Sequence, residues 1–246
     1  IHGNTVGNRD TSDAPLLYCL AVVELAQIRP SIWREKTDGE RTVEDVVRSI
    51  VDNIVIGTPN GGKEDVASGL VYSPPHFTWM DTNYPACTPR AGYPVEIQAL
   101  WAKALETAAE RFGGKYCEKA ALTRNSIMRF FKMSNGGYAD CLRAAPGVPA
   151  AEAEVEDTIR PNMLFLATLG IVGREECESI LRACECLLIP GAVRSLANCS
   201  TKCDMGIEFN GRMLNNPHYP YRGMYCGDED TMRKPAYHNG TAWTWQ

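Results

Sequence analysis

Residues 78–81, Thr-Trp-Met-Asp, combine a carboxyl group with an indole in one short segment. The segment continues to Pro94 and contains three prolines and one glycine, so its backbone should be restricted. The Asp81 carboxyl could protonate a glycosidic oxygen, while the Trp79 face packs against the apolar face of a sugar ring. Alternatively, Asp81 only caps backbone N–H groups, a common role of Asp in turns.

Composition and charge exclude several classes of protein. The 246 residues carry a net charge of −5, which provides no basic surface for nucleic acid or anionic lipid. No apolar run is long enough to cross a membrane. The length fits a single domain spanning residues 1–246. Because the chain begins with Ile1 and has no signal peptide, we expect it to be part of a longer protein.

The ten cysteines are too sparse for a disulfide scaffold in a chain of this size. Cys177 and Cys184 are seven residues apart on an apolar helical stripe, so buried thiols are predicted there. The segment from Cys184 to Cys203 could be considered for zinc, but it has no CxxC pair. We therefore predict reduced thiols, a cytoplasmic location, and no metal or other cofactor.

Two kinds of helix alternate along the sequence. Residues 14–28 are apolar nearly all round and predict a buried helix that begins near Pro15. Residues 42–54 carry one apolar stripe and predict a half-exposed helix. The same alternation continues through residues 94–111, 116–131, 161–169 and 174–188, with further buried helices expected to start at Pro190 and Tyr237.

Strand signals are limited to residues 53–57 and 69–72. Alternating buried and half-exposed helices favour an all-α fold in which inner and outer helices form an α/α toroid. The N-terminal ends of the inner helices should then meet at one rim. Polar residues at these ends would form a single pocket, and they are Asp13, Glu96, Arg160, Asn162, Arg194 and His238.

Residues 57–64, Gly-Thr-Pro-Asn-Gly-Gly-Lys-Glu, resemble a phosphate-binding loop in part. Glu64 occupies the position where a Ser or Thr should hold Mg²⁺, and its charge would repel phosphates. A Gly/Pro turn is the better interpretation.

Other polar residues have both a functional and a purely structural interpretation. Glu96 lies in the first turn of its predicted helix, where the helix dipole favours a negative charge, but it also faces the same rim as Asp81. Arg160 and Asn162 could bind sugar hydroxyls, or they could cap a helix and form an ion pair. His238 places a polar group near an indole, that of Trp243.

Four motifs, in family order over nearly the whole chain, resemble the C-terminal glucosidase domain of glycogen debranching enzymes, the prokaryotic-type amylo-α-1,6-glucosidases. They are Asp10-Thr-Ser-Asp-Ala-Pro-Leu16, Thr78-Trp-Met-Asp-Thr-Asn83 with Thr88-Pro-Arg90 and Val95-Glu-Ile97, Arg160-Pro-Asn162, and Ala236-Tyr-His-Asn-Gly-Thr-Ala-Trp243. The segment 188–196 is a weaker fifth match.

The resemblance implies an (α/α)6 barrel, incomplete at both ends of this chain, and an inverting hydrolase that releases glucose from an α-1,6 branch. By similarity, Asp81 is the general acid. The substrate-binding residues implied are Asp13, Trp79, Arg90, Glu96, Arg160, Asn162, His238 and Trp243. The expected partner is a glucan oligosaccharide or branched polysaccharide, with association possible through faces that missing helices would cover.

Some positions depart from the family pattern. Lys234 stands where an acidic residue is expected, and Cys87 and Ala91 replace a glycine and an acidic residue. The catalytic base of the family is expected beyond Gln246. Two alternatives therefore remain: another (α/α)6 glycosidase of the glucoamylase or trehalase type, or a glycan-binding relative without activity.

Overall fold

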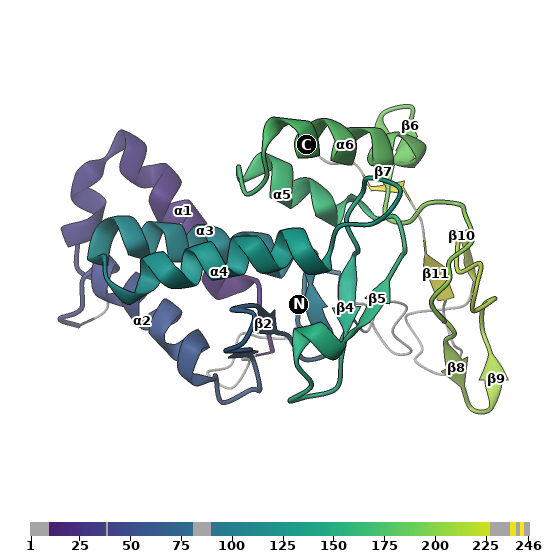
Figure 1. Ribbon diagram of the computed structural model, residues 1–246, viewed down its shortest axis with the longest axis horizontal. Coiled ribbons are helices and arrows are strands. Elements are labelled where there is room, and N and C mark those ends of the chain that lie inside the picture. Colours follow the sequence, from purple (N-terminus) through teal and green to yellow (C-terminus); the bar gives the residue numbers. More distant parts are fainter. Residues whose placement is uncertain (1–9, 38, 81–89, 227–236, 240–241, 244–246) are drawn as a thin grey trace.

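The computed structural model describes residues 10–37, 39–80, 90–226, 237–239 and 242–243 (Figure 1). Its α-helices are α1 (Ala14–Ile28), α2 (Val43–Ile56), α3 (Val95–Phe112), α4 (Lys115–Phe130), α5 (Leu164–Thr168) and α6 (Arg174–Cys184). Short 3₁₀ helices are η1 (Pro30–Arg34), η2 (Ala150–Glu152), η3 (Pro161–Met163) and η4 (Glu185–Leu187). In this part of the chain, no helix combines the length and apolar character needed to span a membrane.

The strands form small antiparallel sheets. One three-stranded sheet contains β3 (Gly92–Pro94), β4 (Cys141–Arg143) and β5 (Glu154–Glu156), and another contains β6 (Leu188–Ile189), β7 (Ala192–Arg194) and β12 (Ala242–Trp243). Three pairs complete the set: β1 (Lys63–Glu64) with β2 (Val71–Tyr72), β8 (Glu208–Phe209) with β9 (Arg212–Met213), and β10 (Arg222–Cys226) with β11 (Tyr237–Asn239).

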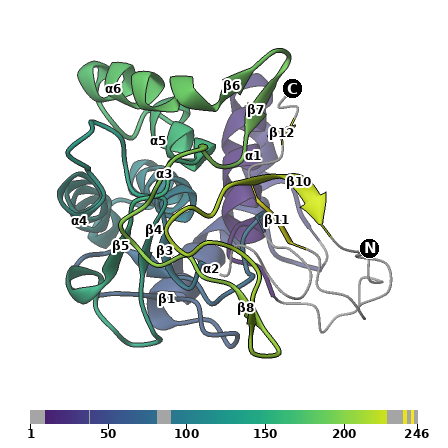
Figure 2. The same ribbon diagram turned by 90° about the vertical axis from the view of Figure 1, so that its right-hand side faces the viewer.

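Helix α3 is the centre of the molecule and lies between α4 and α1 (Figure 2). One buried cluster packs α3 against α1, η1 and α2, and includes Trp101 and Val47. A second cluster packs the other side of α3 against α4, α5 and the β3–β4–β5 sheet, and includes Leu166 and Leu142. Apolar contacts on both sides fix α3, so groups at its N-terminal end are held in place.

The six helices predicted between residues 14 and 188 are confirmed, with small shifts of their ends and with the 3₁₀ helices η3 and η4 forming part of the last two. α2 begins at a capping box in which Thr42 and Asp45 bind each other's backbone N–H groups, and its buried stripe is the predicted one. The strand predicted at residues 53–57 is wrong, because this stripe continues to Ile54 and the helix ends only at Gly57, which has a φ of 113°. The strand predicted at residues 69–72 is confirmed in part, as β2.

The prediction of an all-α fold is wrong, because the described residues contain five small sheets. The helices expected at Pro190 and Tyr237 are strands instead. Pro190 and Gly191 form the two-residue connection between β6 and β7, with Gly191 at a φ of 74°. Such a turn favours hairpin pairing over a helix. Residues 237–239 pair with β10.

The prediction that residues 14–28 are buried all round is also wrong. In α1, Leu16, Cys19 and Val22 are buried, but Leu17 and Leu25 remain about 40% exposed. Only one face of α1 packs against η1, α2 and α3. Uniform apolarity in the sequence therefore did not indicate contact on every side.

The β3–β4–β5 sheet joins the helices at the N-terminal end of α3. It includes a close approach at Gly92, whose φ is 130°, because a Cβ atom there would lie 2.1 Å from the Leu142 carbonyl oxygen. Glycine is therefore required at this position. The turn interpretation of residues 57–64 is also confirmed, since Thr58 and Gly62 close a backbone turn before β1.

Candidate active site

Arg90 lies just before β3 and enters the protein interior with only 3% of its surface exposed. Its φ of 44° is unusual for a residue with a side chain. The guanidinium donates two hydrogen bonds to Glu96 in the first turn of α3, at 2.5 Å from Nη1 to Oε1 and 2.6 Å from Nη2 to Oε2. This bidentate pair joins the backbone just before β3 to the first turn of α3.

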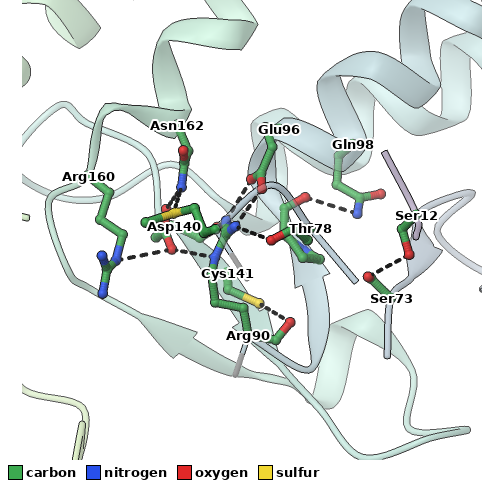
Figure 3. Close-up of polar contacts among 12 residues, drawn as sticks. Ser12, Ser73, Thr78, Arg90, Glu96, Gln98, Asp140, Cys141, Arg160 and Asn162 are labelled. Carbon is green, nitrogen blue, oxygen red and sulfur yellow. Dashed lines mark hydrogen bonds and ion pairs between the residues drawn. The ribbon is translucent and has the colours of Figure 1, made fainter. Parts of the chain in front are cut away.

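Asp140, at the start of β4, connects Arg90 with the η3 segment (Figure 3). Its Oδ2 lies 2.8 Å from Nε of Arg90 and 3.5 Å from Nε of Arg160. Its Oδ1 accepts a hydrogen bond of 2.7 Å from Nδ2 of Asn162. One buried carboxylate therefore bridges three side chains from two separate segments, Arg90 in one and Arg160 with Asn162 in the other.

The same network binds the segment that leads to residue 81. Nη1 of Arg90 donates to Oγ1 of Thr78 at 3.2 Å. Nδ2 of Asn162 also lies 2.9 Å from Sδ of Met80, which is buried. The Met80–Asn162 contact joins residues 82 positions apart. Together with the Thr78–Arg90 hydrogen bond, which Figure 3 shows, it holds the Thr78–Met80 segment by tertiary contacts.

Three carboxyls and two guanidiniums are buried in this network: Glu96, Asp140 and Glu156 with Arg90 and Arg160. Burial raises the pKa of the Glu96 carboxyl, although Arg90 opposes this shift. Burial also raises the pKa of the Glu156 carboxyl, and the negative charge of Asp140 raises it further. Carboxyl groups outnumber guanidiniums, which favours a proton on one carboxyl.

The structure brings together four predicted site residues, Arg90, Glu96, Arg160 and Asn162. Trp79 is half-buried and lies between Thr78 and Met80 in the sequence. Asp81 lies outside the described residues, and the side chains of His238 and Trp243 are likewise not described. Their backbones belong to β11 and β12.

Two other predicted rim residues do not join the network. The Asp13 carboxylate accepts a hydrogen bond of 2.6 Å from the Thr11 hydroxyl at the start of α1. The neighbouring Ser12 hydroxyl lies 2.7 Å from the Ser73 hydroxyl, and this contact connects α1 to the segment before Thr78. Arg194 on β7 instead stacks over Tyr221, with 5.5 Å from its guanidinium carbon to the ring centroid.

Sequence reasoning missed Asp140 and Glu156. Asp140 directly precedes β4 and Glu156 is the last residue of β5, whereas the prediction placed no strands in this region. A signal was present, because Glu154 and Glu156 alternate with Val155, a period-2 pattern typical of a strand with one polar face. In the part of the chain that the structure describes, no three His, Cys, Asp or Glu side chains are grouped to hold a metal.

We expect the wild-type protein to lose stability relative to a Glu156→Gln variant as the pH rises above the ordinary carboxyl pKa of 4.5. With a raised pKa, folded Glu156 keeps a proton that the unfolded chain has already released. The folded state then binds more protons, so its stability falls with increasing pH. Melting temperatures of both proteins between about pH 4 and pH 8 test this, with exposed Glu40→Gln as the control. Parallel curves for wild type and Glu156→Gln would contradict it.

The network is thus buried and charged, lies at the N-terminal end of α3, and contacts Thr78 and Met80. A comparison with curated proteins found no match. A comparison with protein-family models found that the amylo-alpha-1,6-glucosidase model matches residues 3–246.

Proposed function

Because the chain belongs to the amylo-alpha-1,6-glucosidase family, we propose that it is an inverting hydrolase that releases glucose from α-1,6 branch points of glycogen-like glucans. Membership itself implies a function of the glycosidase type. The reaction, the substrate and the roles of individual residues are the finer parts of this proposal. Residues 1–246 act in it as a single glucosidase domain.

The observation that carries the proposal is the attachment of both flanks of residues 81–89 to one buried network. Thr78 and Met80 precede these residues and contact Arg90 and Asn162, while Arg90 itself follows them. Asp81 is the residue directly after Met80. A general acid needs a fixed position relative to the bond that it protonates, and fixed flanks support such a position.

In the proposed mechanism, Asp81 donates a proton to the glycosidic oxygen as the bond to glucose breaks. An inverting reaction also needs a second carboxylate, which activates water on the opposite face of the sugar. Glu96 does not suit this second role, because both of its oxygens accept hydrogen bonds from Arg90. We assign Arg90, Glu96, Arg160 and Asn162 to positioning Asp81 and the glucose.

The remaining pocket residues and the cellular location complete the proposal. Asp13, Trp79, His238 and Trp243 complete the glucose pocket by the family resemblance alone. A cytoplasmic location is supported by the eight cysteines whose side chains the structure describes, which are free thiols.

Release of free glucose from a dextrin with single α-1,6-linked glucose stubs tests the function. We expect glucose from this substrate and little from linear α-1,4 chains or from trehalose. Glucose from either of the latter two instead would favour a glucoamylase-like or trehalase-like enzyme. Binding of the dextrin without any glucose release would favour a glycan-binding relative.

A further inference from the structure

A cavity of about 340 Å³ lies beside the β3–β4–β5 sheet, on the side opposite Leu142. Its polar lining residues are Arg90, Arg143, Glu154, Glu156 and Asp204. Paired positions on β4 and β5 explain this lining, because Arg143 faces Glu154 across the sheet and Cys141 faces Glu156. The volume is within the range of about 300–1,000 Å³ of small-molecule pockets. Arg90 belongs to both the cavity and the buried network.

Glu156 makes this cavity more than a cluster of surface charges. Its side chain is only 2% exposed, and Oε1 accepts a hydrogen bond of 2.8 Å from the Thr158 hydroxyl. Within the described part of the chain, Oε2 receives no hydrogen bond, yet it is not among the fully enclosed polar atoms. Since Glu156 lines the cavity, its unpartnered oxygen is available to a molecule bound there. A ligand hydroxyl that reaches this oxygen can donate a hydrogen bond to it at a side chain that is otherwise almost wholly buried.

The mixture of groups determines the class of ligand. Arg143 supplies donors: its Nη1 donates to the Asp204 carbonyl at 2.5 Å and lies 3.9 Å from Oε2 of Glu154. Glu154 and Glu156 supply acceptors. An anion would be repelled by the Glu154 carboxylate, and a metal ion would be repelled by the Arg143 guanidinium. A neutral ligand with several hydroxyl groups can use both donors and acceptors.

We propose that this cavity binds a glucosyl unit of the α-1,4-linked main chain of the glucan. The inference rests on the proposed function for the identity of the sugar. The hydroxyl groups of that unit donate to Glu156 and Glu154 and accept from Arg143. The cavity thereby holds the polymer next to Arg90, which contacts the segment leading to Asp81.

The test is isothermal titration calorimetry with maltotetraose, which contains only α-1,4 bonds and is not a substrate in the proposed reaction. Ala145 lines the cavity from an exposed position, so Ala145→Trp should fill it without disturbing the core. Ala121→Trp on α4 is the matched control, because Ala121 is exposed and does not line the cavity. Glu156→Gln keeps the shape of the side chain and replaces one of its two carboxyl oxygens by an NH2 group. Melting temperatures show that each variant is folded.

We expect Ala145→Trp, which fills the cavity, and Glu156→Gln, which replaces one carboxyl oxygen by an NH2 group, each to weaken maltotetraose binding about tenfold, and Ala121→Trp to bind like the wild type. No binding to the wild type, or equal binding by Ala145→Trp and wild type, overturns the inference. The glucose-release assay is read separately. If binding depends on the cavity but no glucose is released, the proposed hydrolysis is rejected and the sugar site is kept. If glucose is released but Ala145→Trp binds maltotetraose like the wild type, the sugar site is rejected and the proposed hydrolysis is kept.

Discussion

Glucose release from α-1,6 stubs is expected to fall about 10²- to 10⁴-fold in an Asp81→Asn variant, the range for removal of a general acid. The amide has nearly the same shape as the carboxyl but has no acidic proton for the leaving oxygen. Binding should change little, so the loss should appear in kcat and not in KM. Initial rates of glucose release over a range of dextrin concentrations measure both constants.

A second substrate separates a lost proton donor from a disturbed pocket. Glucosyl fluoride has a leaving group that needs little help from an acid, so Asp81→Asn should hydrolyse it much more nearly like the wild type. The exposed Glu40→Gln serves as control for loss of a carboxylate elsewhere. Equal losses on both substrates would assign Asp81 to positioning, and a fully active Asp81→Asn enzyme would end the proposed mechanism.

An Asp140→Ala variant is expected to lose about 3–5 kcal/mol of the free energy of unfolding, the range for breaking a buried ion pair. Asp140 is 1% exposed and lies against both Arg90 and Arg160. Without it, two guanidiniums remain buried with less compensating charge, and Asn162 loses an acceptor. Urea denaturation followed by circular dichroism measures the change.

The exposed pair Glu44–Arg111, at 2.9 Å, provides the matched control. Glu44→Ala should cost only about 0–1 kcal/mol, because water already screens that pair. If Asp140→Ala does not fold, the less severe Asp140→Asn replaces it. Adding Arg160→Met to the Asp140 variant should recover stability, with a coupling of about 0.5–3 kcal/mol, since it removes one of the stranded charges. A cost below that of Glu44→Ala would show that the network does not depend on Asp140.

The local features of this protein follow from its sequence alone. The apolar stripe from Val43 to Ile54, with Thr42 as its cap, is a property of neighbouring residues and predicts α2 correctly. The ordered motifs led to the family that the comparison with family models bears out. They also selected Arg90, Glu96, Arg160 and Asn162, which the structure brings together.

Contacts between distant residues were decided only by the tertiary structure. Asp140 is 50 residues from Arg90, and only the pairing of β3 with β4 brings the two together. The role of Asp140 as a bridge between Arg90 and Arg160 therefore depends on the tertiary structure. Most of the strands have only two or three residues, too few for a clear period. Even the alternation at residues 154–156 covers a single short strand, and only its pairing with β4 shows that it belongs to a sheet. The exposed side of α1 has the same cause, because apolar residues show what can be buried, but only packing determines which of them are.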